Sequence, residues 1–132
     1  MKLENWPVAL NDFIDARRDT AFVWGTTDCC LFAADAVEAM TGTDYVADYR
    51  GTYTDAKGAL RLINDAGGLS AFVPKSFEEV EPGYAQRGDV VLLEIDDRNS
   101  LGIHLGAVIA GQGEAGIVFV PTALAQRAWR TA

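Results

Sequence analysis

Cysteine and histidine are scarce in this sequence. Its 132 residues include two cysteines, Cys29 and Cys30, and one histidine, His104. Neighbouring cysteines lie about 3.8 Å apart at Cα, which is shorter than an unstrained disulfide spans, so no disulfide framework is expected. Structural zinc sites use four cysteine or histidine ligands, and three such residues do not readily build one. We therefore expect neither a metal nor another cofactor.

Excess positive charge and long apolar runs are also missing. The formal net charge is −8, from 19 acidic against 11 basic residues, and the arginines form no stripe. Nucleic-acid binding needs a basic face, so we expect no nucleic-acid partner. No window approaches the roughly 20 apolar residues of a membrane span, and the N-terminus lacks the pattern of a signal peptide. The length fits a single domain over residues 1–132.

Apolar residues recur at helical spacing in the first half of the chain. Helices are expected over residues 5–18 and 28–41, and from Thr54 or Asp55 to Ala66. The second is the strongest signal, with Thr27 or Asp28 as its N-cap, and it is apolar around much of its circumference, which predicts a central position. In the third helix, Ala59, Leu60 and Ile63 are expected to face inward.

The second half of the chain is rich in β-favouring residues. Strands are predicted over residues 88–95, 100–110 and 116–120, with a short strand at 77–80, and residues 127–131 are expected to close the sheet. Residues 96–99 read as a turn. Helices followed by an antiparallel meander indicate the α+β class, with N-terminal helices packed on a small antiparallel sheet.

Three short motifs follow one another in the chain: Trp24-Gly25 before Asp28-Cys29-Cys30, Gly88-Asp89 before an apolar strand, and Ser-Leu-Gly-Ile-His-Leu-Gly at residues 100–106. In this order they resemble the NlpC-type cysteine peptidases, which carry an Asp-Cys-Ser-Gly-like turn and a strand similar to His-Val-Gly-Ile-Tyr-Leu-Gly. The resemblance runs from about residue 5 to residue 120. It implies a papain-like fold with a central helix against the sheet.

A shorter set of motifs points to one branch of that family. Trp-Gly-x-x-Asp-Cys-Cys at residues 24–30, Arg-Gly-x-Tyr at 50–53 and Ala-Trp-Arg at 128–130 resemble small NlpC-like proteins encoded in phage and prophage tail gene clusters. This resemblance implies a place in the virion tail, near its tip or in its assembly, after synthesis in the bacterial host cytoplasm. The partners it implies are other tail or hub proteins.

Cys29 is the candidate nucleophile. It stands at the expected start of a helix, where free amides can lower the pKa of a thiol and stabilise an oxyanion. The family pattern also places the nucleophile directly after Asp, while Cys30 takes the family's serine position and is expected to be packed. A buried cysteine can equally be a small apolar core residue, and the residues alone leave both interpretations open.

His104 is the only candidate base, but the family's histidine aligns with Ser100. Residues 100, 102 and 104 share one face of a strand, and His104 lies about 13 Å further along at 3.3 Å per residue. A register shift of four residues would keep its facing. The alternative is a strand histidine with one backbone partner. The polar residue that orients the histidine in this family is missing from residues 116–120.

Two hypotheses remain. In the first, the chain is a phage or prophage tail-tip or tail-assembly component on an NlpC-like scaffold whose catalytic machinery is degenerate. In the second, it is a cysteine endopeptidase or amidase of cell-wall peptidoglycan, with Cys29 as nucleophile and His104 as base, facing an open groove. A redox or metal module is disfavoured, since adjacent cysteines lack the Cys-x-x-Cys spacing.

Overall fold

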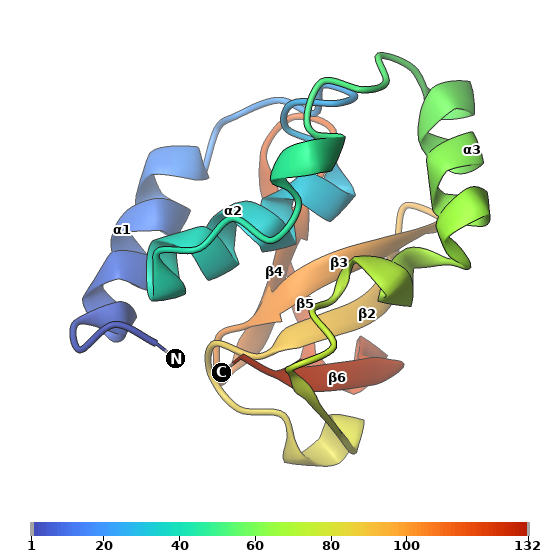
Figure 1. The fold of residues 1–132 in the computed structure, drawn as a ribbon. Coiled ribbons are helices and arrows are strands. Elements are labelled where there is room, and N and C mark those ends of the chain that lie inside the picture. Colours follow the sequence, from blue (N-terminus) through green and yellow to red (C-terminus); the bar gives the residue numbers. More distant parts are fainter. Residues whose placement is uncertain (1, 132) are drawn as a thin grey trace.

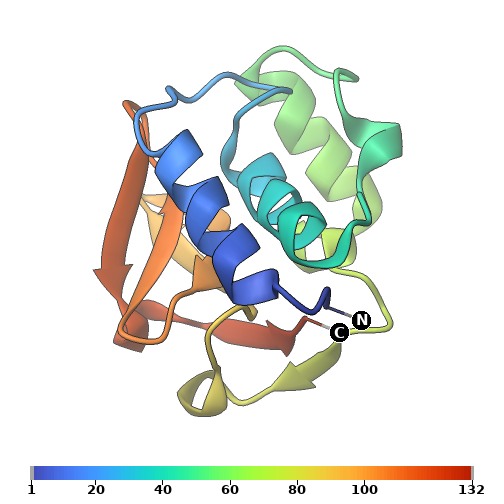
Figure 2. The same cartoon turned by 90° about the vertical axis from the view of Figure 1, so that its left-hand side faces the viewer.

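Three helices lie against one face of a six-stranded antiparallel sheet in the computed structural model, which describes residues 2–131 (Figures 1 and 2). The helices are α1 (Trp6–Arg17), α2 (Cys29–Thr41) and α3 (Ala56–Ala66). The strands are β1 (Glu78–Val80), β2 (Val90–Ile95), β3 (Arg98–His104), β4 (Val108–Gln112), β5 (Ile117–Pro121) and β6 (Arg127–Arg130). The predicted α+β class and the three predicted helices are confirmed.

The sheet has the order β1-β6-β2-β3-β4-β5. The C-terminal strand β6 lies between β1 and β2, so the expectation that residues 127–131 join the sheet is confirmed. Asp96 and Asp97 both have positive φ, 52° and 61°, and form the two-residue turn that favours tight hairpins. Strand β3 therefore begins at Arg98, and six residue pairs fix its register against β2.

The prediction of one strand over residues 100–110 is wrong. The chain reverses after His104 and returns as β4. Gly106 supplies the turn with a φ of +97°, a conformation that glycine adopts without steric cost, and the Leu105 N–H donates to the Val108 carbonyl at 2.8 Å. Strand β4 runs from Val108 to Gln112, so Gln112 lies in the sheet and not in a turn.

Helix α2 is central, as predicted. It packs against α1 on one side and against β3 and β4 on the other. Phe32, Ala36 and Met40 are fully buried along it. The helix ends at Gly42, whose φ of 81° gives the left-handed C-cap and whose N–H donates to the Glu38 carbonyl.

The expected inward face of α3 is only partly confirmed. Ala59 is buried and Ile63 is half-buried, but Leu60 is 59% exposed. Leu60 lies at the wall of a groove and not in the core. Helical periodicity could not distinguish the buried side of α3 from the side that forms the groove wall, because both sides carry apolar residues.

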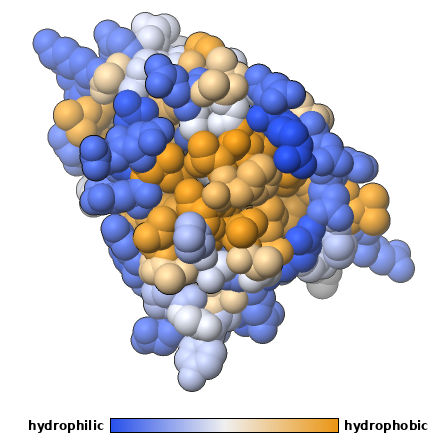
Figure 3. Space-filling view, turned by 180° about the vertical axis from the view of Figure 1, so that it is seen from behind, coloured by the Kyte–Doolittle hydropathy of each residue, from blue (hydrophilic) through white to orange (hydrophobic). Residues whose placement is uncertain are grey.

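The sheet also has an apolar face turned away from the helices. Val91, Leu93, Ile95, Ile109 and Ala128 form a second buried cluster there. Figure 3 shows a continuous apolar area on this side of the molecule, ringed by hydrophilic residues. No helix in the described part of the chain covers this side.

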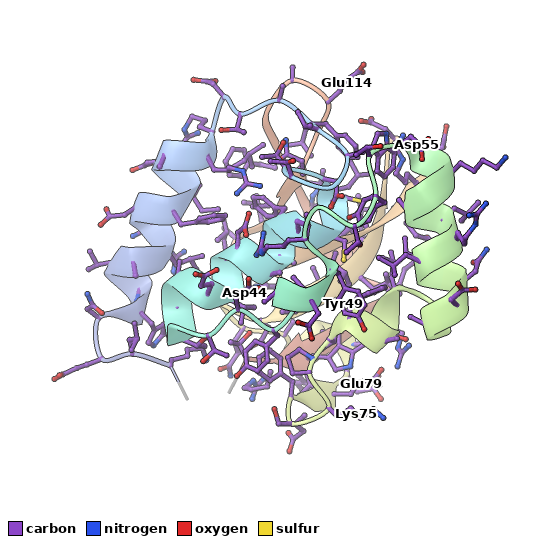
Figure 4. The ribbon with its side chains drawn as sticks, turned by 45° about the horizontal axis from the view of Figure 1, so that its top comes forward. Asp44, Tyr49, Asp55, Lys75, Glu79 and Glu114 are labelled. Carbon is purple, nitrogen blue, oxygen red and sulfur yellow. The ribbon has the colours of Figure 1, made fainter. Side chains whose placement is uncertain are left out.

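Ion pairs join the helical layer to the loop that follows α2. Asp35 of α2 accepts from Arg17 of α1 at 2.6 Å and from Arg50 at 2.5 Å. Arg50 also contacts Asp44, labelled in Figure 4, at 2.7 Å. The side chains of Asp35, Arg17 and Arg50 are only 19%, 12% and 28% exposed, so this carboxylate is the shared partner of two half-buried cations.

Asp35→Ala is expected to lower the free energy of unfolding by about 2–3 kcal/mol, because it leaves two half-buried arginines without their common carboxylate. Asp15→Ala is the matched control. It removes an exposed pair with Arg18 at 3.2 Å, and such pairs contribute only about 0–1 kcal/mol. Urea unfolding of the two variants measures both. Equal losses would contradict a structural role for the Asp35 pairs.

Candidate functional site

A buried carboxylate organises the start of α2. Asp28 is 1% exposed. Its oxygens accept the N–H groups of Cys30 at 3.1 Å and Leu31 at 2.9 Å, and the N–H of Gly25 at 3.0 Å. The Tyr53 hydroxyl donates to the same carboxylate, and burial together with this contact raises the pKa of Tyr53. The interpretation of Asp28 as a helix cap is confirmed.

The Trp-Gly and Arg-Gly-x-Tyr motifs meet at this cap. Gly25 has a φ of +79°, and a Cβ there would collide with the carbonyl oxygen of Tyr53. The Gly25 carbonyl accepts the N–H of Gly51 at 3.2 Å. The turn at Gly25 and the loop at residues 50–53 are therefore packed and hydrogen-bonded together. Together they fix the position of the first residue of α2.

Cys29 is that first residue, and its side chain is 5% exposed. The Cys29 Sγ lies 4.0 Å from the Asn99 carbonyl oxygen of β3. Burial and the neighbouring Asp28 charge raise the pKa of Cys29, and the Ser100 side chain and the charge of Arg98 oppose them only in part. The thiol is therefore protonated near neutral pH, despite its place at a helix N-terminus.

Cys30 points into the core. It is 8% exposed and belongs to the main apolar cluster with Leu31 and Phe32. Burial raises the pKa of Cys30 well above that of a free thiol, and the charge of Asp28 raises it further. The expectation that Cys30 is packed is confirmed.

A groove of about 620 Å³ passes over Cys29. One wall is α3, the other is the β2–β3 hairpin, and residues 68–70 lie at its side. Apolar residues dominate the lining: Trp24, Ala56, Ala59, Leu60, Ile63, Leu69 and Leu92. The arrangement offers a mainly apolar groove with one protonated thiol in its lining.

Ser100 stands beside this thiol. It is 1% exposed, pairs with Leu93 of β2, and its side chain partly offsets the rise in the pKa of Cys29. Its hydroxyl donates to the Arg98 carbonyl at 3.3 Å. A hydroxyl can donate to sulfur but cannot take its proton at neutral pH. Ser100 therefore supplies no base for the thiol.

His104 lies elsewhere on the strand. It is four residues after Ser100, about 13 Å further along β3. It is 6% exposed, and its Nδ1 accepts the N–H of Gly106 at 3.0 Å. Burial lowers the pKa of His104, and the charge of Asp89 offsets this in part. In the described residues no hydrogen bond joins His104 to Cys29, so the structure brings Cys29 to Ser100 and not to the histidine.

Gln112 is a site residue that the sequence analysis missed. It is 2% exposed, and its Nε2 donates to the carbonyls of Thr20 at 2.8 Å and Gly113 at 2.9 Å. It lies on β4, whereas the polar residue was sought on residues 116–120. The signal that could have found it is Leu105-Gly106, which ends one strand and moves the next one forward to Val108.

Gln112 and Ser100 line a second cavity, of about 240 Å³. Arg98 covers one side of it, with its guanidinium carbon 5.0 Å from the ring centroids of both Phe22 and Trp24. Glu114, labelled in Figure 4 in the loop between β4 and β5, completes the rim with Asp96. This cavity is more polar than the groove over Cys29 because amide, hydroxyl and charged groups line it.

No group of three or more histidine, cysteine, aspartate or glutamate side chains within residues 2–131 is arranged to hold a metal ion. In the same range, no helix has the length and apolar character needed to cross a membrane.

The chain matches one protein family over residues 1–131, and that family is described as a domain of unknown function, DUF6950. No curated protein matches the chain significantly.

The lowered pKa of His104 predicts a pH dependence of stability. Below about pH 6.5 His104 is protonated in the unfolded chain but stays neutral in the folded chain, because its pKa is lowered there. The free energy of unfolding therefore falls as the pH drops. The slope reaches at most about 1.4 kcal/mol per pH unit. His104→Asn keeps an acceptor for the Gly106 N–H but does not titrate, and it should flatten this part of the curve.

Chemical denaturation at pH 7.5, 6.5 and 5.5 measures the effect in both proteins. Parallel curves for the parent and His104→Asn would show that His104 is not the titrating group.

Proposed function

The chain belongs to the DUF6950 family, and for this member we propose a role as a tail-tip or tail-assembly component of a phage or prophage, built on an NlpC-like, papain-like scaffold that lacks hydrolase chemistry. The helical layer, the antiparallel sheet and the cysteine at the start of a central helix support the scaffold part of the proposal. The motif resemblance at residues 24–30, 50–53 and 128–130 supports the tail part.

The observation that carries the proposal is that the position aligned with the family's histidine holds Ser100, next to the Asn99 carbonyl that the Cys29 Sγ contacts at 4.0 Å, while His104 bonds the Gly106 N–H instead. The Ser100 side chain acts on the pKa of Cys29, so it lies near the thiol. Nucleophilic cysteine catalysis needs a base that withdraws the thiol proton. A serine hydroxyl does not do this, and the buried thiol has a raised pKa. In this proposal the scaffold keeps the groove over Cys29 but has no residue that can withdraw the thiol proton.

The remaining groove fits a binding role. Exposed Leu60 and half-buried Ile63 and Leu92 form its walls over a volume of about 620 Å³. A groove of this size, mainly apolar and open at the surface, can hold an extended segment of another protein. We propose that the groove and its rim contact neighbouring tail or hub proteins.

The alternative is a peptidoglycan endopeptidase or amidase that uses Cys29 and His104. The position of Cys29 in the lining of the groove favours it. It requires β3 to slide by four residues, and the six pairs with β2 oppose this. The slide would also withdraw Leu101 and Ile103, which are 3% and 0% exposed, from their places in the core.

Deletion of the gene from the phage or prophage that encodes it tests the tail role. We expect infectious particles to fall by several orders of magnitude, with tails that are absent or incomplete in electron micrographs. Both the parent gene and Cys29→Ala should restore them, since the thiol is not needed. Normal particles from the deletion strain would contradict the tail role, and failure of a folded Cys29→Ala protein to restore them would contradict the non-catalytic role.

Purified peptidoglycan provides the matching enzymatic measurement. The parent protein should release no more soluble fragments than Cys29→Ala does. Release that disappears in both Cys29→Ala and His104→Asn would establish the alternative.

A further inference from the structure

Arg98 is a cation without a counter-ion in the lining of the groove over Cys29. Within the described residues no carboxylate oxygen forms an ion pair with its guanidinium, which distinguishes it from other arginines that do form such pairs: Arg17, Arg18, Arg50, Arg127 and Arg130. The side chain is exposed to solvent at the groove. An unpaired guanidinium there is available to an anionic group of a ligand.

Two aromatic rings hold this guanidinium in place. Its central carbon lies 5.0 Å from the ring centroids of both Phe22 and Trp24, and these two rings contact each other edge to face at 4.6 Å. Contact with an aromatic face leaves the N–H groups of an arginine free for hydrogen bonding. Because the side chain is positioned before a ligand arrives, less conformational entropy is lost when it pairs.

Arg98 and Trp24 also bound the groove on one side. Both residues line the groove and the second cavity beside Ser100, so they lie between the two spaces. An occupant of the groove therefore meets the guanidinium at this boundary. A peptide chain that ends there can place its terminal carboxylate on Arg98 and needs no route past Trp24.

The rest of the lining suits a peptide better than a hydrocarbon chain. Apolar side chains dominate it, but Asn64, Ser70 and Asn99 add amide and hydroxyl groups from both walls and from the side of the groove. These groups carry hydrogen-bond donors and acceptors. A peptide backbone offers partners for both, whereas a bare hydrocarbon chain would remove water from them without compensation.

We propose that the groove binds the apolar C-terminal segment of a partner protein, with the terminal carboxylate paired to the guanidinium of Arg98. The planar fork of an arginine matches the two oxygens of a carboxylate and can bond both at once. The apolar side chains of the segment then lie between α3 and the β2–β3 hairpin. This inference rests on the proposed binding role of the groove and names the part of the partner that enters it.

Acidic residues near Arg98 oppose an anion and set the sign of one test. Asp97 lines the same groove, and Asp96 and Glu114 line the cavity beyond Arg98. Binding of a carboxylate therefore depends on direct contact with the guanidinium and not on a general positive field. Asp97→Asn removes the nearest opposing charge in the groove, and asparagine tolerates the positive φ of 61° at this position.

Titration of the ¹⁵N-labelled protein at pH 7.5 with acetylated pentapeptides tests the proposal. The probes are Gly-Ser-Leu-Ala followed by Leu, Val or Phe, each as the free acid and as the C-terminal amide. At least one free acid should shift the signals of α3 and Arg98 in a saturable way, and it should bind at least tenfold more tightly than its amide, because hydrogen bonds to charged groups are the stronger ones. Equal affinity of acid and amide, or no saturable shift with any free acid up to about 5 mM, would overturn the proposal.

Variants provide an independent arm with opposite signs. Arg98→Gln should weaken binding of the free acid at least tenfold, to the level of the amide, and Asp97→Asn should strengthen it by about two- to fivefold, the size of a surface charge interaction. Arg61→Gln is the matched control, since Arg61 is exposed on α3 outside the lining, and it should leave binding unchanged. Unchanged binding in a folded Arg98→Gln protein would contradict the inference. If that variant does not fold, the acid and amide peptides on the parent protein decide the matter.

A further peptide separates a chain terminus from an acidic side chain. Acetyl-Gly-Ser-Leu-Glu-Leu amide carries its carboxylate within the chain, and it should bind no more tightly than the amide probes. Binding as tight as that of the free acids would overturn the assignment to a C-terminus. These titrations use purified protein and do not depend on the particle counts of the deletion strain, so failure here and failure of the tail assignment are distinguishable.

Discussion

The carboxylate of Asp28 is the contact on which the rest of this structure depends. It is buried, and it gathers the N–H groups of Gly25, Cys30 and Leu31 and the hydroxyl of Tyr53. These donors come from the approach to α2, from its first turn and from the loop before α3. One side chain thereby caps the central helix, fixes the bend that precedes it and secures the loop that leads to the wall of the groove. The position of Cys29 follows from this arrangement.

The same carboxylate helps to decide what Cys29 can do. A helix N-terminus lowers the pKa of a thiol, but burial of Cys29 and the negative charge of Asp28 act in the opposite direction. The Cys29 Sγ contacts the Asn99 carbonyl oxygen, and the imidazole of His104 lies further along β3 with its Nδ1 occupied by a backbone N–H. No group on the described residues is placed to ionise the thiol. The binding role that we propose for the groove rests on that combination.

Local signals in the sequence predict the elements that position the site. The cap at Asp28, the left-handed stop at Gly42 and the apolar strand β2 depend on neighbouring residues alone, and all three are present. The strand break at Gly106 was missed because an apolar segment of that length also suits one long strand. The exposure of Leu60 and the burial of Gln112 depend on which distant segments pack beside them. The residue spacing within α3 or β4 does not show which segments pack beside them, and Gln112 lies between two glycines, a context that is also typical of turns.

The ionisation of Cys29 tests the central claim most directly. Cys30→Ala leaves Cys29 as the one thiol in the chain, and its rate of alkylation by iodoacetamide can be followed from pH 6 to pH 10.5. The account predicts an apparent pKa above that of the same thiol in the urea-unfolded variant, with slow alkylation at neutral pH. An apparent pKa below about 7 in the folded protein, which is typical of activated cysteines, would contradict it.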